Sequence, residues 1–407
     1  MQKTRLKKYA NLIATVGVNV KRGQEVQITA ELDQPEFVKR VVEECYKAGA
    51  SKVSVDFSYQ PLAKLHVRYC SDKVLGTLEK WQIEKWEHQA EVLPCKIYLI
   101  SEDPDGLKGI NQKKFAKSMA ARSKLIKPIR NRMENKYQWC IAAVPGKEWA
   151  KKVFPGERTS VAVEKLWEAI LSTSRVYDDP VLEWKMHNEN LAKKCEYLNS
   201  LGIKELYYKS KNGTDLRVGL IPEALFCAGG ETTLGGNYFN PNIPSEEAFT
   251  SPRRGDADGI VYSSRPLSYA GQLIDNFWIK FEGGRAVEVG AEKNEDLLRE
   301  IISMDEGAAY LGECALVPYS SPIRKSGLLF YNTLFDENAA CHLALGRGFS
   351  NLIRDYDKYT DEQIRELGIN DSIVHEDFMI GTDDLSITAI TSDGRSVEIF
   401  KDGEWAF

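Results

Sequence analysis

The sequence lacks the short motifs that identify several common enzyme classes. No G-x-G-x-x-G run follows a predicted strand and no G-x-x-x-x-G-K-[ST] run occurs, so neither of the usual phosphate-binding loops is present. G-x-S-x-G and H-E-x-x-H are also missing, which argues against a serine-hydrolase elbow and against the helix-borne zinc site of the zincins. Any catalytic chemistry must therefore come from side chains that are distant in the sequence.

Cysteine pairs and long apolar runs are also scarce. The eight cysteines are scattered, with no C-x-x-C pair and no spacing typical of a disulfide framework, which predicts a reduced protein. No stretch approaches the ~20 apolar residues of a membrane span. The first residues, MQKTRLKKYA, do not contain the apolar core of a signal peptide. We therefore expect a cytoplasmic protein without a membrane partner.

Basic charge is not concentrated anywhere along the chain. The 54 Lys and Arg residues and 59 Asp and Glu residues are mixed, for a net charge of -5, whereas a nucleic-acid partner would require a concentrated basic face. The basic residues at Lys113, Lys117 and Arg122–Arg132 have helical spacing and predict a solvated helix face. With 407 residues and a hydrophobic fraction of 43%, the chain should form two or three globular domains.

The first half of the chain has the pattern of an α/β domain. Strands are predicted at Glu25–Glu31 and Lys52–Phe57. Between them, Asp33 followed by Glu36 predicts a capped helix start, and the helix should end at Gly49. A strand, helix and strand within ~35 residues form a βαβ unit, so the sheet should be mainly parallel. The alternation continues with helical patterns at 62–90 and 112–135 and strand patterns at 95–101 and 137–144.

The second half changes to an α+β pattern that is rich in strands. The charged, amphipathic stretch Asp179–Leu201 predicts a helix that bridges the two halves, and short strand patterns separated by Gly and Asn turns follow it. From Leu385 onward the residues alternate as hairpin strands, with turns at Asp393-Gly394 and Asp402-Gly403. We therefore predict an α/β N-terminal domain at residues 1–178, a bridging helix at 179–202 and an α+β domain at 203–407.

Unusual polar residues occur in the stretch Tyr331–Phe349, YNTLFDENAACHLALGRGF. Asp336, Glu337 and His342 lie there among small and apolar residues, and buried charges must be neutralised by hydrogen bonds or by a cation. On one continuous helix, Glu337 and His342 would point about 140° apart, at roughly 100° per residue. We therefore expect Glu337 to close a strand or loop and His342 to open a helix.

Three further segments of the second half place acids or His in apolar surroundings. They are Asn242–Thr250, Leu311–Ala315 and His375–Ile380. In the last of these, His375 and Asp377 share a face if the segment is extended. Carboxylates mixed with imidazoles fit Zn²⁺, Mn²⁺ or Co²⁺ better than Ca²⁺, and more ligands than one ion needs indicate two ions. The α+β domain is therefore predicted to carry a metal site.

Each of these features also has a purely structural interpretation. A Glu-Glu pair such as Glu246-Glu247 is commonly a solvated turn in a chain with 59 acids, and His375 and Asp377 can form a plain hydrogen-bonded pair. Cys341 is expected to be a small core residue rather than a nucleophile or ligand. The metal interpretation gains weight because the chain has five histidines, and two of them lie in these acid-containing apolar segments.

The same stretches resemble the thermophilic-type metallo-aminopeptidase family, which includes aminopeptidase T and aminopeptidase S. The family pattern N-[MLI]-P-[TS]-E-E-x-F-T is matched by Asn242–Thr250, F-D-E-N-A-x-x-H-x-A-x-G by Phe335–Gly346, and H-x-D-F-M-I-G by His375–Gly381. Near the N-terminus, V-G-x-N-x-x-x-G-Q-x-V is matched by Val16–Val26, and the A-G-A at Ala48–Ala50 is also similar. The resemblance covers nearly the whole chain.

This resemblance implies a two-metal exopeptidase that removes N-terminal residues from peptides with a free N-terminus, commonly as a homodimer. Carried over position by position, the metal-site residues would be Glu247, Glu313, Glu337, His342, His375 and Asp377. Glu313 would bridge two ions of Zn, Co or Mn, and Glu247 is preferred to Glu246 on spacing alone. The implied reaction is attack of a metal-activated water on the scissile carbonyl, with Glu247 or Glu313 moving the proton.

One position departs from the family pattern. Seven residues after His342 the family usually has Tyr, thought to stabilise the tetrahedral intermediate, whereas this chain has Phe349. Phenylalanine donates no hydrogen bond, and the loss of one such donor typically costs on the order of 10²–10³ in rate. Alternatives to an active aminopeptidase are therefore a metal-binding or peptide-binding pseudoenzyme, a weakly active relative, and another two-metal hydrolase that acts on a different amide or ester.

Overall fold

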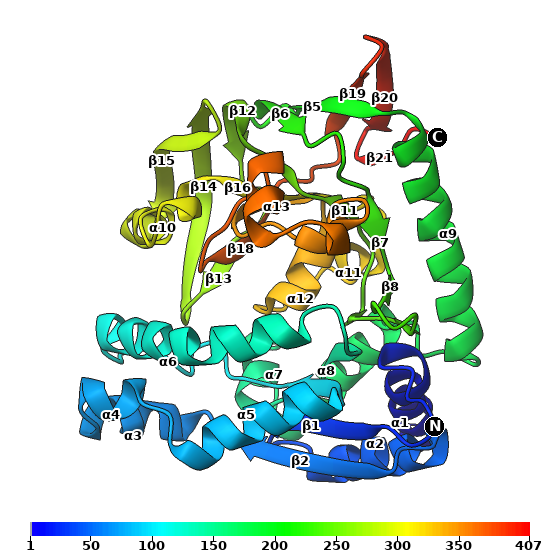
Figure 1. Cartoon of the computed structure of the whole chain (residues 1–407), viewed down its shortest axis with the longest axis vertical. Helices are drawn as coiled ribbons and strands as arrows, with labels where there is room; N and C mark the ends of the chain where they lie inside the picture. Colours follow the sequence, from blue (N-terminus) through cyan, green and yellow to red (C-terminus); the bar gives the residue numbers. More distant parts are fainter. Residues whose placement is uncertain (1) are drawn as a thin grey trace. The chain divides into compact units, whose positions relative to one another are not determined.

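The computed structural model describes residues 2–407, which form two compact units (Figure 1). The first unit runs to Lys185 and also includes Gly230–Ile243, while the second consists of Met186–Gly229 and Pro244–Phe407. The division falls inside helix α9 (Pro180–Ser200), which is the helix predicted from its amphipathic pattern. The predicted domain limits at residues 178 and 202 stay a prediction.

The first unit is built on a parallel sheet, as its βαβ pattern predicts. The strand order is β10-β4-β3-β1-β2, and every pairing is parallel. One face of β1 is buried through Val26, Ile28 and Ala30, because successive side chains of a strand point to opposite sides. The strands are β1 (Glu25–Glu31), β2 (Lys52–Ser58), β3 (Cys95–Ile100), β4 (Trp139–Ala143) and β10 (Asn242–Ile243), and a separate pair consists of β8 (Glu231–Thr232) and β9 (Tyr238–Phe239).

Helices pack around this sheet (Figure 1). The stretch 62–90, predicted as helical throughout, contains breaks, and one helix begins where the Ser71 hydroxyl accepts a hydrogen bond from the Val74 amide at 3.3 Å. Serine is a favoured N-cap because its oxygen satisfies an otherwise unpaired helix N–H. The helices are α1 (Gln2–Leu12), continued by a π-helical turn (Ile13–Gly17), α2 (Pro35–Ala48), α3 (Pro61–Tyr69), α4 (Asp72–Gly76), α5 (Lys80–Val92), α6 (Gln112–Met133), α7 (Lys147–Val153) and α8 (Thr159–Thr173).

The start of α2 differs from its prediction. Its N-cap is Gln34 and no side chain caps the helix, so the predicted cap at Asp33 is wrong. The Asp33 carboxylate instead accepts hydrogen bonds from the Ser101 hydroxyl at 3.0 Å and from the Lys147 amide at 3.4 Å. A short acidic side chain can satisfy several nearby donors, and here tertiary partners occupy it. The predicted helix end is confirmed by Gly49, whose φ of 111° is left-handed.

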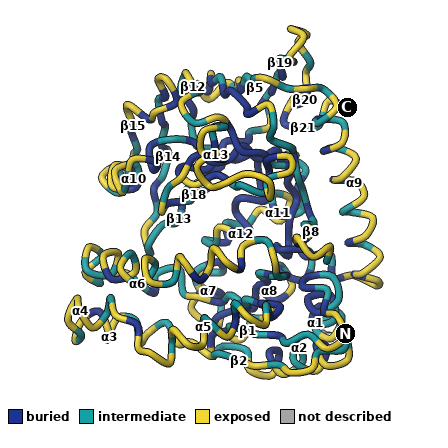
Figure 2. The backbone as a smooth tube through the Cα atoms, in the orientation of Figure 1, coloured by how far each residue is buried: buried dark blue, intermediate teal, exposed yellow. Residues whose placement is uncertain are grey.

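The second unit contains two antiparallel sheets, as its strand-rich pattern predicts. One has the order β18-β17-β16-β11-β7, and the other follows β13-β14-β12-β6-β5-β19-β20-β21, with β15 paired to β14. A single hydrophobic core joins both sheets and includes Leu343 and Phe378 from the first and Leu206 and Phe277 from the second. The central strands β16 and β17 of the first sheet are buried throughout, whereas β12, β14 and β15 of the second alternate between buried and more exposed residues (Figure 2).

The strands and helices of the second unit complete the fold. The predicted turns at Asp393-Gly394 and Asp402-Gly403 connect its last three strands. Its strands are β5 (Ile203–Lys209), β6 (Asp215–Leu220), β7 (Cys227–Ala228), β11 (Ala248–Thr250), β12 (Pro252–Tyr262), β13 (Leu267–Tyr269), β14 (Gln272–Glu282), β15 (Arg285–Lys293), β16 (Leu311–Leu316), β17 (His342–Gly346), β18 (His375–Met379), β19 (Ser386–Thr391), β20 (Ser396–Lys401) and β21 (Glu404–Trp405). Its α-helices beyond α9 are α10 (Glu295–Ile302), α11 (Pro322–Lys325), α12 (Thr333–Asp336) and α13 (Asp361–Leu367). Within residues 2–407, no helix has the length and apolar character needed to cross a membrane.

Candidate metal centre

Four of the six candidate ligands lie on one face of the five-stranded sheet of the second unit. The register of strands β16, β17 and β18 sets Glu313 opposite Ala344, and Ala344 opposite Asp377. His342 and His375 begin β17 and β18, and each lies two residues from a member of this row, so both point to the same face. The small side chain of Ala344 leaves space between the two carboxylates. The sheet therefore concentrates acids and imidazoles that are far apart in the sequence.

The segment around His342 folds in the reverse of the predicted order. Glu337 lies in a 3-10 turn (Glu337–Ala339) that follows α12, and His342 begins strand β17, so the predicted helix at His342 is wrong. Leu and Ala favour helices locally, but β17 is paired on both sides and buried throughout. Tertiary pairing overrides the local preference. The extended β18 confirms the predicted shared face of His375 and Asp377.

Both imidazoles direct the same ring nitrogen into the cluster. Nδ1 of His342 lies 3.2 Å from the Ala340 carbonyl, and Nδ1 of His375 lies 2.7 Å from the Arg347 carbonyl. A carbonyl accepts a hydrogen bond from Nδ1–H, so the neutral ring carries its proton on Nδ1 and its free lone pair on Nε2. Metal-ligating histidines are commonly oriented in this way. The arrangement therefore suits coordination through Nε2.

The candidate ligand atoms form two groups that share one carboxylate. Atoms of Glu247, Glu313 and His342 lie within 4.8 Å of one another, and so do atoms of Glu313, His375 and Asp377. His342 Nε2 is 3.1 Å from Glu247 Oε2. His375 Nε2 is 3.3 Å from Glu313 Oε2 and 3.4 Å from Asp377 Oδ1. Five of the six predicted residues are thus close enough together to bind cations.

Glu337, the sixth predicted residue, is outside these two groups but borders them. It is buried, and its Oε1 accepts a hydrogen bond from Asn338 Nδ2 at 3.3 Å. Its pKa is raised well above the ordinary value, first by burial and then by the negative charges of Asp377 and Glu247. These interactions place the Glu337 carboxyl beside both ligand groups.

The side chains of Glu246 and Glu247, although adjacent in sequence, have different neighbours. Glu247 belongs to the first ligand group, whereas the Glu246 carboxylate lies 4.0 Å from His187 Nε2. The Glu246 amide donates to Asn338 Oδ1 at 2.6 Å, and His187 Nε2 lies 2.7 Å from the Ser245 carbonyl. Asn338 and His187 thus support the segment that presents Glu247. Sequence reasoning did not select them, although Asn338 is visible as a polar residue within an apolar run.

Asp336 has a structural role that the sequence did not reveal. Its two carboxylate oxygens accept backbone hydrogen bonds from Phe330 at 2.9 Å and from Asn332 at 3.1 Å. The Arg265 guanidinium lies 3.4 Å from the Asp336 carboxylate; Asp336 is buried and Arg265 is mostly buried. Asp336 therefore holds the loop that precedes Glu337 and belongs to neither ligand group.

Burial and neighbouring charges shift the pKa values across the cluster. Burial raises the pKa of Glu313 to about 7, and the charge of Asp377 adds to this effect, while a hydrogen bond from His375 opposes it. Burial opposes a charged His342, but a hydrogen bond to Glu247 and the surrounding carboxylates raise its pKa to about 10. Burial likewise opposes an ionised Asp377, yet the charge of His375 lowers its pKa. Shifts of this kind concentrate at functional sites.

One buried oxygen of the cluster is poorly satisfied by the protein. Among the described residues, Asp377 Oδ1 is buried and accepts no well-aligned hydrogen bond, although His375 Nε2 lies 3.4 Å away; a buried oxygen left unsatisfied typically costs about 1–3 kcal/mol. The surrounding donors are carboxylate oxygens and imidazole nitrogens, and neither group contains a cysteine. That set suits Zn²⁺, Mn²⁺ or Co²⁺. The residues present therefore fit a divalent cation, which would also satisfy Asp377.

Phe349 borders the second ligand group. Its ring centroid lies 4.9 Å from that of His375, and it packs edge-on against Phe249 at 5.7 Å. The Phe349 amide donates to Ser251 Oγ at 2.9 Å. The position at which the family pattern has Tyr is thus next to a candidate ligand, but it carries no hydroxyl.

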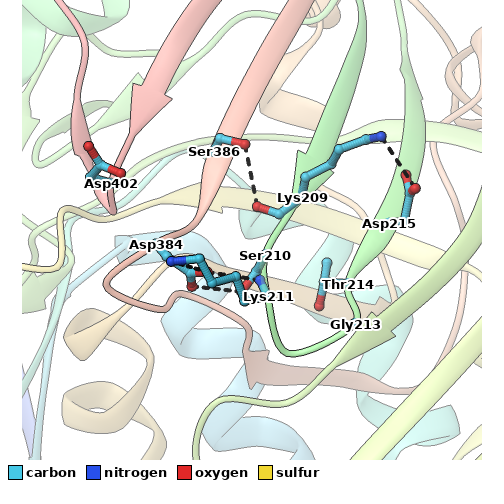
Figure 3. A pocket seen from close by; sticks show the side chains of 9 residues that line it. All are labelled: Lys209, Ser210, Lys211, Gly213, Thr214, Asp215, Asp384, Ser386 and Asp402. Atoms are coloured by element: carbon cyan, nitrogen blue, oxygen red, sulfur yellow. Dashed lines mark hydrogen bonds and ion pairs between the residues drawn. The ribbon is translucent and has the colours of Figure 1, made fainter.

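A separate hollow of the second unit, with a volume of about 490 Å³, is lined by the turn between β5 and β6 and by residues near β19 (Figure 3). Lys209 Nζ lies 3.4 Å from Asp215, and Lys211 Nζ lies 3.9 Å from Asp384. The Ser210 hydroxyl donates to Asp384 at 3.0 Å. The two contacts to Asp384 join the turn to the residues before β19, whereas the Lys209–Asp215 pair lies within the hairpin. The hollow is therefore explained by structure and is assigned no ligand.

The fold thus presents, on a buried sheet face, carboxylates and histidines that are close enough together to bind divalent cations. A family model described as thermophilic metalloprotease (M29) matches residues 2–405. The chain is 40% identical over 405 residues to Aminopeptidase AmpS of Bacillus subtilis (strain 168), covering 99% of this chain and 98% of that protein. It is 37% identical over 402 residues to Aminopeptidase T of Thermus aquaticus, covering 98% of each.

A solved structure from the same group of proteins has the same fold as this chain. Wild-type AmpT from Thermus thermophilus superimposes with a TM-score of 0.92 at 36% identity, over 100% of both chains. The chain belongs to the thermophilic metalloprotease (M29) family, as the resemblance implied. Membership of a metalloprotease family implies the use of a divalent metal, and the donor set described above is able to bind one.

Proposed function

We propose that the protein is an aminopeptidase that removes N-terminal residues from peptides with the help of two divalent ions. The observation that carries the proposal is the pair of ligand groups that share Glu313. Membership of a metalloprotease family, together with relatives named aminopeptidases, supports the same activity. Zn²⁺, Co²⁺ and Mn²⁺ are the ions that suit this donor set.

The charge of the cluster favours two ions over one. Metal binding requires neutral imidazoles and ionised carboxylates, and in that state Glu247, Glu313, Glu337 and Asp377 would contribute four negative charges. A single divalent ion would leave two negative charges uncompensated in a buried site, which is costly. Two ions balance the charge. Each ligand group would hold one ion, with Glu313 between them and Glu337 beside them.

Such ions, when bound, polarise the scissile carbonyl and lower the pKa of a water molecule. The protein's own groups orient the reactants and move protons. We propose that Glu247 and Glu313 are the catalytic carboxylates, and that one of them accepts the proton of the attacking water and passes it to the leaving amine. The backbone carbonyls that hold His342 and His375 keep both rings in one orientation. Recognition of the free α-amine by an ion or a carboxylate would restrict cleavage to the first peptide bond.

A second candidate function follows from Phe349. Its ring lies against His375, where a tyrosine hydroxyl could donate to the developing oxyanion, and phenylalanine has no such donor. Loss of one such donor typically costs about 10²–10³ in rate. This favours either a slow peptidase or a protein that binds metal and peptide without cleaving. Both the slow peptidase and the non-cleaving protein should bind metal, but only the slow peptidase should turn over a peptide substrate.

Hydrolysis of aminoacyl-p-nitroanilides tests the proposal. We expect protein dialysed against a chelator to be inactive and to regain activity with Co²⁺, Mn²⁺ or Zn²⁺, while the N-acetylated substrate is not cleaved. Turnover that is absent with every metal, despite two bound ions per chain, would instead assign the pseudoenzyme. Equal cleavage of the acetylated substrate would assign a different two-metal hydrolase.

Family membership also leads us to propose a homodimer that works in the cytoplasm on peptides. Sedimentation equilibrium of the purified chain measures the first property, and a mass close to that of one chain would contradict it. Fractionation of cells that produce the protein measures the second property.

A further inference from the structure

The first unit contains a cavity of about 250 Å³ that its fold does not explain. It lies on one face of the parallel sheet, where β1 contributes Gln27 and Thr29 and β3 contributes Lys96 and Tyr98. The register sets Gln27 beside Lys96, and Thr29 beside Tyr98 and Asp56. Strands of parallel sheets covered by helices are normally apolar on both faces. A polar face of this kind therefore needs a reason other than packing.

Lys96 is the most unusual residue of this cavity. It is only 4% exposed, and its Nζ lies 4.5 Å from the ring centroid of Trp86 and 5.0 Å from that of Tyr137. Among the residues that the structure describes, no hydrogen bond or ion pair reaches this ammonium. Burial, together with the charges of Arg130 and Lys85, lowers its pKa to about 8. A buried lysine without a counter-ion is destabilised, and an anion in the cavity would relieve it.

The carboxylate in the cavity wall is already neutralised. The Asp56 side chain accepts hydrogen bonds from Gln27 and from Lys85, and Gln89 in turn donates to Gln27. Arg122 also lines the cavity, and its guanidinium donates to the Thr77 carbonyl at 3.3 Å. The lining thus holds more basic than acidic groups, and Lys96 is the buried one.

Flat aromatic surface forms the remaining wall. Helix α5 contributes Trp81 and Trp86, and Tyr98 adds a third ring from the sheet. Trp81 is 64% exposed although it is a large apolar residue. Indole faces stack on aromatic ligands. The volume equals that of roughly eight water molecules at ~30 Å³ each, which is enough for a ring system carrying a short acid chain.

We propose that this cavity binds a small aromatic carboxylate, with the carboxylate at Lys96 and the ring against Trp81 and Trp86. The proposal does not depend on the proposed peptidase activity, because it concerns residues of the first unit and is tested by binding alone.

Calorimetric titration of the full chain with indole-3-acetate, and with the neutral indole-3-acetamide of the same shape, tests this site. We expect the acid to bind at least tenfold more tightly than the amide. Lys96→Met should weaken binding of the acid at least tenfold and leave the amide unchanged. Trp81→Ala, at an exposed position, should weaken both ligands at least threefold. Lys124→Met, at an exposed position of α6, is the matched control and should change neither.

Equal affinity for acid and amide would overturn the proposal, and so would full affinity for the acid in Lys96→Met. Acetate that binds as tightly as indole-3-acetate would also overturn it, because the aromatic wall would then contribute nothing. The melting temperature of Lys96→Met is the control for folding. If it is no lower than that of the parent protein, a loss of binding results from the missing ammonium.

Discussion

In the metal-free protein, the Glu313 carboxyl should contribute more stability as the pH falls, and a substitution at this position tests that contribution directly. Burial raises the pKa of this carboxyl from 4.5 to about 7, so the folded state binds the proton more tightly than the unfolded state does. The contribution of Glu313 to stability is then fully present below pH 4.5 and is lost as the pH rises through about 7. At ~1.4 kcal/mol for each tenfold change in proton affinity, the full effect is about 3 kcal/mol.

Whether Glu313→Gln raises or lowers the free energy of unfolding at high pH tells whether the ionised carboxylate destabilises the metal-free protein. Glu313→Gln keeps the shape of the side chain and removes its charge. At pH 8 in the presence of a chelator, we expect the variant to be more stable than the parent protein by up to ~3 kcal/mol. For a domain of 150–250 residues this corresponds to a melting temperature higher by about 6–12 °C. The advantage should shrink at pH 5, because the parent carboxyl is then protonated.

Scanning calorimetry at both pH values, with chelator and with Co²⁺ or Mn²⁺, measures these quantities. Metal should reverse the order of stability, because a ligand that binds only the folded state stabilises it and Glu313 contributes to both ligand groups. Glu366→Gln, at an exposed position of α13, is the matched control and should change neither curve. A Glu313→Gln variant that is less stable than the parent under every condition would refute the reasoning.

Three further predictions concern single residues. His342 belongs to one ligand group only, so His342→Ala should lower the metal content by about one ion per chain in elemental analysis; an unchanged content would exclude it as a ligand. Phe349→Tyr restores a hydrogen-bond donor beside His375 and should raise kcat by tenfold or more, towards ~10²–10³, at constant metal content; an unchanged rate would mean that another group donates. Arg265→Leu leaves Asp336 buried without its cation and should cost about 3–5 kcal/mol of unfolding free energy in urea; a smaller loss would show that the backbone bonds to Asp336 suffice.

Local patterns predicted the first unit well because its elements follow from the chain itself. The alternation at Glu25–Glu31 gives the strand its buried face, and Gly49 ends the following helix through a left-handed conformation that favours glycine. Asp33 was misjudged because its partners, Ser101 and Lys147, are distant in sequence. A cap is a local prediction, and a tertiary contact can displace it.

The candidate site was predictable in its residue types but not in its geometry. His375 and Asp377 share a face through strand periodicity alone. The strand at His342 could not be inferred, because its Leu and Ala residues favour a helix and only pairing with two neighbouring strands makes it extended. The sharing of Glu313 between the groups likewise depends on register across β16, β17 and β18, which no local pattern contains.

The short strand β10 affects how the first unit can fold during synthesis on the ribosome. It supplies the edge of the first unit's sheet next to β4, yet it consists of Asn242–Ile243 and follows the whole of α9 in the chain. Until the ribosome has made those residues, the backbone groups on that side of β4 have no strand to pair with, and an unpaired edge is a template for association with other chains. The sheet of the first unit therefore cannot be complete until the chain has been synthesised as far as Ile243.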